Sequence, residues 1–214
     1  MNIYLQYGSA YVPFRLVAGV AAGEHSSIGG APPFGVVPRR PNRHTRYLAT
    51  LGLEGEVAVS IFTSLDYKLR QGPQDFFQSV YRLHGPDSDV IEFVVHPQKV
   101  IRDERSTWRS VIPACGLRYE RKGGDPACQT IDDWGQPEIY ANHKLGGQPH
   151  FKQLEGDMAG VLKLMQKGYV HLFQLAGPSR DDAFLDVKWP FGKYVFHLFI
   201  KKTGPDFSFY AIWG

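Results

Sequence analysis

Runs of apolar residues, many of them alternating with polar ones, recur along this chain at the length of β-strands. Strict alternation indicates a half-buried strand, and a short apolar run bounded by Gly or Pro is typical of a buried strand. The segments that we expect to be strands are 2–20 (two strands joined at Gly8-Ser9), 46–62 (two strands), 91–95, 169–175, 194–200 and 207–213.

Only one segment has clear helical spacing. Apolar residues recur at intervals of three and four between residues 157 and 167, Asp157 is a suitable N-cap, and Gly168 would end the helix. Residues 75–83 fit both a helix and an alternating strand, and periodicity does not separate the two for so short a run. The sequence therefore predicts a mostly β protein with one or two helices.

A Gly-Gly motif occurs twice. Residues 28–34 and 145–151 both read aliphatic, Gly, Gly, any residue, Pro, any residue, Phe. Paired glycines permit positive φ and the close approach of another backbone, and the proline fixes φ after them. We expect a structural turn in each copy, and the alternative is a cradle of N–H groups for an anion. The turn residues are Gly29, Gly30, Pro32, Gly146, Gly147 and Pro149.

The two motifs divide the chain into similar parts. Each is followed by a linker, a strand, a loop and a second strand, an order that suggests an internal duplication. We therefore predict an α+β, mostly β fold with two pseudo-symmetric β-rich halves and one or two helices. A single domain would cover residues 1–214, with a first repeat at about 24–100, a connector at about 101–140 and a second repeat at about 141–214.

The composition fits one cytoplasmic domain and says little about chemistry. Among 214 residues, 24 Lys and Arg against 21 Asp and Glu give a net charge of +3, too small to argue for nucleic acid. The first residues lack the basic and long apolar regions of a signal peptide, and no apolar run has the length of a membrane span. We expect Cys115 and Cys128, the only two cysteines, to be reduced structural thiols rather than zinc ligands.

Several of these segments together resemble the YwqG-like family, bacterial tandem-repeat proteins of unassigned biochemical function. The resemblance implies that residues 77–83 form a strand, and it implies an association with toxin systems. The chain departs from the family at Trp189-Pro190-Phe191-Gly192, where the family has an acidic residue. The segments that carry the resemblance are His143-Lys144-Leu145-Gly146-Gly147-Gln148-Pro149, Leu172-Phe173-Gln174-Leu175, Phe196-His197-Leu198-Phe199-Ile200 and Asp206-Phe207-Ser208, with looser matches at 28–32, 47–53 and 79–81.

No catalytic or nucleotide-binding motif is present. The sequence lacks a Gly-x-Ser-x-Gly elbow, a Walker loop, a dinucleotide fingerprint and a His-Glu-x-x-His motif. His171 and His197 lie in apolar runs and are expected to be hydrogen-bonded sheet residues rather than ligands. The alternative is a hydrolase or metal-dependent enzyme with a cleft between the repeats, for which His143, His150 and Asp133 are the candidates. We predict no cofactor and no metal.

Binding is therefore the leading functional prediction. Loops that mix charge with Pro, Gly or an aromatic residue are common in protein interfaces, although such aromatic residues also cap cores. The predicted partner-binding residues are Trp134, Arg180, Asp181, Asp182, Asp132, Asp133, Arg39, Arg40 and Arg43.

The specific prediction is a cytoplasmic immunity protein that neutralises a bacterial toxin by stoichiometric binding, without turnover. The toxin could be a nuclease effector delivered by type VI secretion, although the weak positive charge disfavours a very basic nuclease as partner. A module that binds a sugar or another small ligand is a third alternative. We expect a monomer or homodimer that binds neither nucleic acid nor membrane directly.

Overall fold

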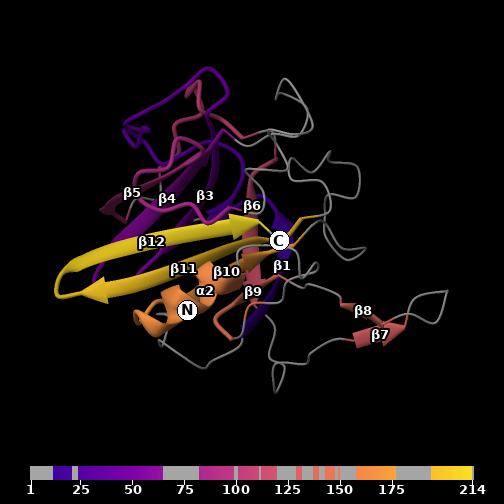
Figure 1. Ribbon diagram of the computed structural model, residues 1–214. Coiled ribbons are helices and arrows are strands. Elements are labelled where there is room, and N and C mark those ends of the chain that lie inside the picture. Colours follow the sequence, from indigo (N-terminus) through magenta and orange to yellow (C-terminus); the bar gives the residue numbers. More distant parts are fainter. Residues whose placement is uncertain are drawn as a thin grey trace.

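The computed structural model contains twelve strands and one helix within the residues it describes (Figure 1). It describes residues 12–20, 24–64, 82–98, 101–110, 112–119, 129–131, 137–139, 143–147, 149, 158–176 and 194–213. The strands are β1 Val12–Ala18, β2 Ser27–Ile28, β3 Arg46–Gly52, β4 Val57–Thr63, β5 Ile91–Pro97, β6 Cys115–Tyr119, β7 Gln129–Ile131, β8 Pro137–Ile139, β9 Lys144–Leu145, β10 Val170–Leu175, β11 Phe196–Thr203 and β12 Asp206–Trp213, and the helix is α2, Met158–Gln166.

Ten of the strands form one antiparallel sheet. From edge to edge the order is β12-β11-β10-β9-β1-β6-β2-β3-β4-β5, and β7 and β8 pair separately. The fold is α+β and mostly β, as predicted. Within the described residues, no helix combines the length and the apolar character that crossing a membrane requires.

The sheet curls so that its two halves enclose a common hydrophobic core. Apolar side chains of β3, β4 and β5 belong to the same buried cluster as those of β10, β11 and β12. The two edge strands meet as the sheet curls. Phe93 of β5 stacks on Phe209 of β12 with ring centroids 5.4 Å apart, and His84 forms a bridge with Ala211. The main core therefore lies between the halves rather than within either one.

Each outer face of the sheet has its own cover. α2 packs Val161 and Leu164 against the outer face of β11 and β12. On the other half, the loop after β2 places Val36 against the outer face of β3, β4 and β5, with Trp108 beside it. The loop of residues 33–46 thus takes the place that α2 has in the second half.

The strands of the two halves follow one another in the same pattern when the sheet is followed inward from either edge. β2-β3-β4-β5 and β9-β10-β11-β12 have equivalent neighbours, and β6 and β1 occupy equivalent central positions. The β3–β4 and β10–β11 pairings each shift register once. At these shifts Gly29 and Gly146 donate their N–H groups to the carbonyl oxygens of Leu48 and Leu172, at 2.7 and 3.0 Å. The arrangement is repeated, while a duplication in the ancestry of the chain stays a prediction.

The paired glycines of both Gly-Gly motifs have the positive φ that was expected of them. Gly29, Gly30, Gly146 and Gly147 have φ between 64° and 70°, a region in which a β-carbon is strained. The first turn is also closely packed, since a β-carbon on Gly30 would lie 2.6 Å from the Cβ of Ala114. The N–H groups of Gly29, Gly30 and Gly146 donate to backbone carbonyl oxygens, so they are not available to an anion.

The predicted helix is confirmed, and one central strand was missed. α2 occupies the predicted segment, and Gly168, with φ of 84°, follows its end. The connector was expected to be irregular, yet it contributes β6, which pairs with β1 at the centre of the sheet. The other described partner of β1 is β9. The first strand of the predicted hairpin, residues 2–11, lies outside the described residues, as do Asp157 and residues 75–81 of the ambiguous segment. Residues 82 and 83, the end of that segment, are described and belong to neither a strand nor a helix.

We expect Gly30→Ala to destabilise the protein more than Gly55→Ala. Both glycines have positive φ, so both variants should lose about 1–2 kcal/mol through the left-handed backbone. Only Gly30 lies against Ala114, whereas nothing lies within 4 Å of a β-carbon on Gly55. Overpacking should therefore cost G30A a further 1–3 kcal/mol or so. Urea unfolding measures the difference, and equal losses in the two variants would contradict the packing argument.

Candidate binding groove

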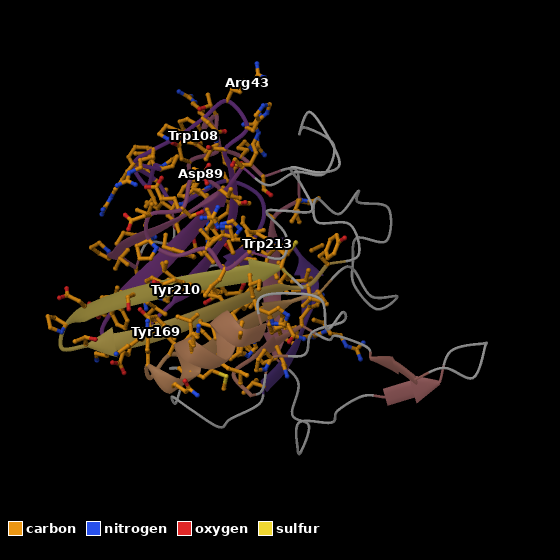
Figure 2. The ribbon with its side chains drawn as sticks, viewed as in Figure 1. Arg43, Asp89, Trp108, Tyr169, Tyr210 and Trp213 are labelled. Atoms are coloured by element: carbon orange, nitrogen blue, oxygen red, sulfur yellow. The ribbon has the colours of Figure 1, made fainter. Side chains whose placement is uncertain are left out.

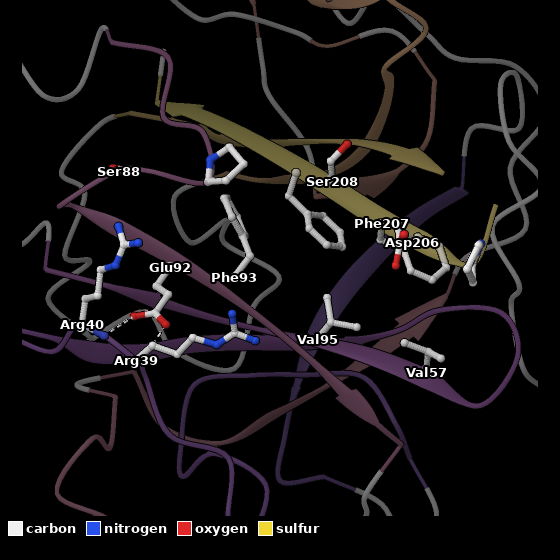
Figure 3. Close-up of a pocket in the computed structure, with 13 residues that line it drawn as sticks. Arg39, Arg40, Val57, Ser88, Glu92, Phe93, Val95, Asp206, Phe207 and Ser208 are labelled. Carbon is white, nitrogen blue, oxygen red and sulfur yellow. Dashed lines mark hydrogen bonds between the residues drawn. The ribbon is translucent and has the colours of Figure 1, made fainter. Parts of the chain in front are cut away.

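A groove lies between the edge strands β5 and β12, where the two halves of the sheet meet (Figure 3). Its volume is about 410 Å³, and ligand sites usually have volumes of about 300–1,000 Å³. β5 and β12 provide the two sides, and the loop after β2 provides a rim. The lining residues on which the argument depends are Arg39, Arg40, Glu92, Phe93, Val95 and Phe207.

The floor of the groove is aromatic and belongs to the inner face of the sheet. Phe93 stacks on Phe209, and Phe209 in turn stacks on Phe207 at a centroid distance of 6.4 Å. Val95 lies on the same face of β5 as Phe93 and is 39% exposed. The inner face of the sheet is therefore open to solvent here, at the seam between the edges.

Contacts between the halves limit the groove at both ends. At one end, His84 forms a bridge with Ala211, and Pro86 and Ser88 contribute to the lining. Toward the other end, Glu54 of the first half forms an ion pair with Lys202 of β11. These contacts hold β5 and β12 in a fixed relation and leave the space between them defined.

One carboxylate positions the arginines of the rim. Glu92 of β5 accepts the backbone N–H groups of Arg39 and Arg40 at 2.6 and 3.0 Å, and such charge-assisted bonds are stronger than neutral ones. In Figure 3 the guanidinium of Arg39 extends along β5 toward Val95, and that of Arg40 extends toward Ser88. Neither guanidinium has a hydrogen bond or ion pair with a described residue.

The surface that continues from this rim is basic and partly apolar. Residues 33–46 carry four arginines and no acidic residue, and residues 101–110 carry three arginines and two acidic residues. Phe34 and Ile101 are 63% and 69% exposed, and they are neighbours because the N–H of Phe34 donates to the carbonyl oxygen of Ile101 at 2.8 Å. Arg43 lies at the outer end of this surface (Figure 2). We call residues 33–46 and 101–110 the basic loops.

A serine–histidine pair in the first half is closed to substrate. Ser60 Oγ lies 2.9 Å from His96 Nε2, an arrangement that can activate a nucleophile. His96 Nδ1 donates to the carbonyl oxygen of Pro97 at 2.7 Å, which leaves Nε2 to accept the serine proton. Ser60 is fully buried, and it continues a chain of buried hydroxyl groups through Thr50 to Tyr47. We therefore interpret the pair as part of the scaffold.

The described histidines of the second half, His143, His171 and His197, form hydrogen bonds within the sheet. His171 Nδ1 lies 3.2 Å from the carbonyl oxygen of Gly146, and its Nε2 lies 3.4 Å from His197 Nδ1. His143 is buried and accepts the N–H of Ala176 at 3.1 Å. No group of three His, Cys, Asp or Glu side chains within the described part of the chain is placed to hold a metal ion.

Buried polar side chains recur at equivalent places in the two halves. Each half has a row of three buried polar residues that lie side by side on its three consecutive strands. Because the row is repeated, it belongs to the architecture of the halves and does not mark one catalytic centre. The two rows are Ser27, Thr50 and Ser60, and Lys144, Gln174 and His197.

The structure brings together three of the residues predicted to bind a partner. Arg39, Arg40 and Arg43 are exposed on one loop, and the first two line the groove. Cys115 is buried, and its sulfur lies 2.9 Å from the carbonyl oxygen of Pro113. The other predicted site residues lie outside the described residues: Trp134, Arg180, Asp181, Asp182, Asp132, Asp133, His150 and Cys128.

Sequence reasoning missed the part of the groove that comes from the sheet. Phe93, Val95 and Phe207 lie in ordinary strand patterns, and nothing in those patterns shows that β5 and β12 are edge strands or that they meet. The basic run in the loop was the one available signal. It predicted Arg39 and Arg40 as binding residues without indicating that they line a groove with strand residues.

Comparisons with known proteins assign no family to this fold. No family model matches the chain, and searches of curated proteins and of solved structures found no match. The resemblance to the YwqG-like family therefore stays a prediction.

We expect Glu92→Ala to release the rim loop without unfolding the protein. Loss of the carboxylate removes both bonds to the Arg39 and Arg40 backbone, so the loop should open about tenfold more often. Trypsin should then cut faster after Arg39, while Pro41 protects the next bond. Glu104→Ala is the control, because Glu104 forms only an exposed ion pair with Arg109. Cleavage of E92A at the wild-type rate would contradict this account.

A second prediction concerns Tyr47. Burial raises the pKa of its hydroxyl, against the smaller opposing effects of Arg102 and the hydroxyl neighbours. The folded protein then keeps the Tyr47 proton at a pH where the unfolded chain has lost it, so stability falls as pH rises past about 10. The Tyr47→Phe variant has no ionisable hydroxyl at this position, so it lacks this pH-dependent loss of stability. Its unfolding free energy should fall less than that of wild type between about pH 9 and 11, and parallel curves would contradict the prediction.

Proposed function

We propose that this protein acts by stoichiometric binding of a protein partner through the groove and the adjoining basic loops. The observation that carries the proposal is a pair of arginines, Arg39 and Arg40, whose backbone N–H groups are bound by Glu92 at the rim of a groove with an open aromatic floor. Arginine and aromatic side chains supply most of the strong anchors in protein interfaces. An exposed apolar floor with a charged rim is also the usual composition of a binding surface.

The chemistry of the surface favours an acidic partner. The basic loops carry seven arginines and two acidic residues, although the whole chain has a net charge of only +3. Surfaces of opposite charge associate faster, and surfaces of like charge repel each other. The buried histidines and serines are hydrogen-bonded within the sheet, which supports binding over the hydrolase and metal-enzyme alternatives.

In its most specific form, the proposal is a cytoplasmic immunity protein that neutralises a bacterial toxin by covering its active site. The toxin would be an effector such as a nuclease delivered by type VI secretion, with an acidic surface that meets the basic loops. A rigid sheet that presents two loops is sufficient for such an inhibitor, since occlusion needs no turnover. Support for this form comes from the surface chemistry and from the resemblance to a family associated with toxin systems.

The test starts with capture of the partner from the native cell and continues with the purified pair. We expect a complex of fixed stoichiometry by light scattering, with a Kd that weakens as salt rises. Reversing two charges in the basic loops, Arg43→Glu and Arg105→Glu, should weaken the purified complex at least about tenfold. Lys163→Glu, on the exposed side of α2, is the matched control and should change the Kd less than about twofold.

Co-expression tests the immunity form separately. The protein should protect cells from a toxin encoded next to it, and the charge-reversed variant should protect less than K163E. Binding that disappears after nuclease treatment would replace the protein partner with nucleic acid. Substrate turnover that depends on His143 or His150 would replace binding with the enzyme alternative.

A further inference from the structure

We propose that the groove binds an extended segment of the partner in which acidic and apolar residues alternate. This inference rests on the proposed binding function and names the chemistry of the ligand. The segment lies along the open edge of β5, with its acidic side chains at Arg39 and Arg40 and its apolar side chains on the aromatic floor.

The backbone of β5 is suited to strand addition. β5 ends the sheet, and β4 is the only strand paired with it among the described residues. An edge strand presents a row of N–H and C=O groups, to which an extended peptide can add. The opposite edge is less available, because His84 already bridges β12 at Ala211. The geometry therefore assigns the main-chain contacts to β5.

The side chains around β5 require an alternating ligand. Successive residues of a strand point to opposite faces, and Phe93 and Val95 belong to the inner face. Glu92 directly precedes Phe93 and therefore points to the opposite face of the strand, where it binds the loop that carries Arg39 and Arg40. A segment added to β5 places every second side chain on the floor and the others beside the arginines. Carboxylates match the planar guanidinium groups, and apolar side chains match the floor.

The charges at the two ends of the groove also indicate how the ligand is oriented along it. The backbone of Arg39 and Arg40 is bound to Glu92 toward the Ser88 end of the groove, and the Arg39 guanidinium extends from there toward Val95, whereas Asp206 lines the end near Val57 (Figure 3). Acidic residues of the ligand should therefore lie toward the Glu92 end, because Asp206 repels them at the other. The guanidinium groups have no partner among the described residues, so the ligand displaces no ion pair that the structure shows there.

The test uses the full-length protein and fluorescently labelled hexapeptides with blocked ends. The probe alternates glutamate and valine. The first control has the same composition with three glutamates followed by three valines, and the second replaces each glutamate with lysine. We expect the alternating peptide to bind at least about tenfold more tightly than either control. Equal binding of the block-ordered peptide would overturn the alternation, and equal binding of the lysine peptide would overturn the role of the arginines.

Protein variants locate the site. The double variant Arg39→Ala/Arg40→Ala should weaken binding of the alternating peptide at least about tenfold. Val95→Lys should also weaken it, because a charged side chain then replaces an apolar one on the floor of the groove. Lys163→Ala and Leu162→Lys are matched controls on the exposed side of α2, outside the groove and the basic loops. Both controls should leave the Kd within about twofold of wild type. Equal effects of the groove and control variants would place the peptide elsewhere and overturn the proposal.

Peptide N-methylation tests strand addition itself. Neighbouring N–H groups of an extended peptide point to opposite edges, so only alternate positions can bond to β5. Methylation should abolish binding at every second position and leave the others nearly unchanged. A uniform effect along the peptide would overturn strand addition. If the peptides fail while the partner complex still depends on Arg43 and Arg105, this inference falls and the proposed function stands.

Discussion

The pairing of β1 with β6 at the centre of the sheet is the contact on which the rest of the fold depends. β1 comes from the start of the chain and pairs on its other side with β9 of the second half, whereas β6 pairs with β2 of the first half. Each half is thus connected to the other through main-chain hydrogen bonds as well as through the core. Arg15 and Arg118 lie opposite each other in this pairing, a like-charge arrangement that strand pairing alone would disfavour.

This central pairing explains why the halves share one core. With β1 and β6 joined, the sheet is long enough to curl, and the inner faces of both halves bury the same set of apolar side chains. The Gly-Gly turns permit this by allowing close backbone contact, as Gly29 shows against the carbonyl groups of Ile112 and Pro113. A half in isolation would expose its inner face to water, so the two halves are expected to fold as one cooperative unit.

The same curl creates the candidate groove. Two edge strands that would lie at opposite ends of a flat sheet are brought together, so that Phe93 of β5 stacks on Phe209 of β12 and His84, which precedes β5, forms a bridge with Ala211 of β12. Along the remaining seam, aromatic side chains of the core reach the surface, and the loop held by Glu92 adds positive charge beside them. Polar groups with catalytic potential, such as Ser60 and His96, are instead buried within the sheet and satisfied by hydrogen bonds. In the part of the chain that the structure describes, Ser60 and His96 are thus buried, while arginine and aromatic side chains line the groove.

Local sequence determined most of the strands, the helix and the turns of this protein. The alternation over residues 46–62, the spacing before Gly168 and the Gly-Gly pairs each depend on neighbouring residues, so they can be recognised without knowledge of the fold. The run of arginines at Arg39–Arg43 was also visible in the sequence, but its position beside the groove was not. Only the tertiary structure decided that β6 is central, that β5 and β12 are edges that meet, and that Glu92 binds the backbone of Arg39 and Arg40 beside the groove that Phe93 and Phe207 line. Those features depend on contacts between residues far apart in the chain, and the pattern within a single strand carries no information about which distant strand will lie beside it.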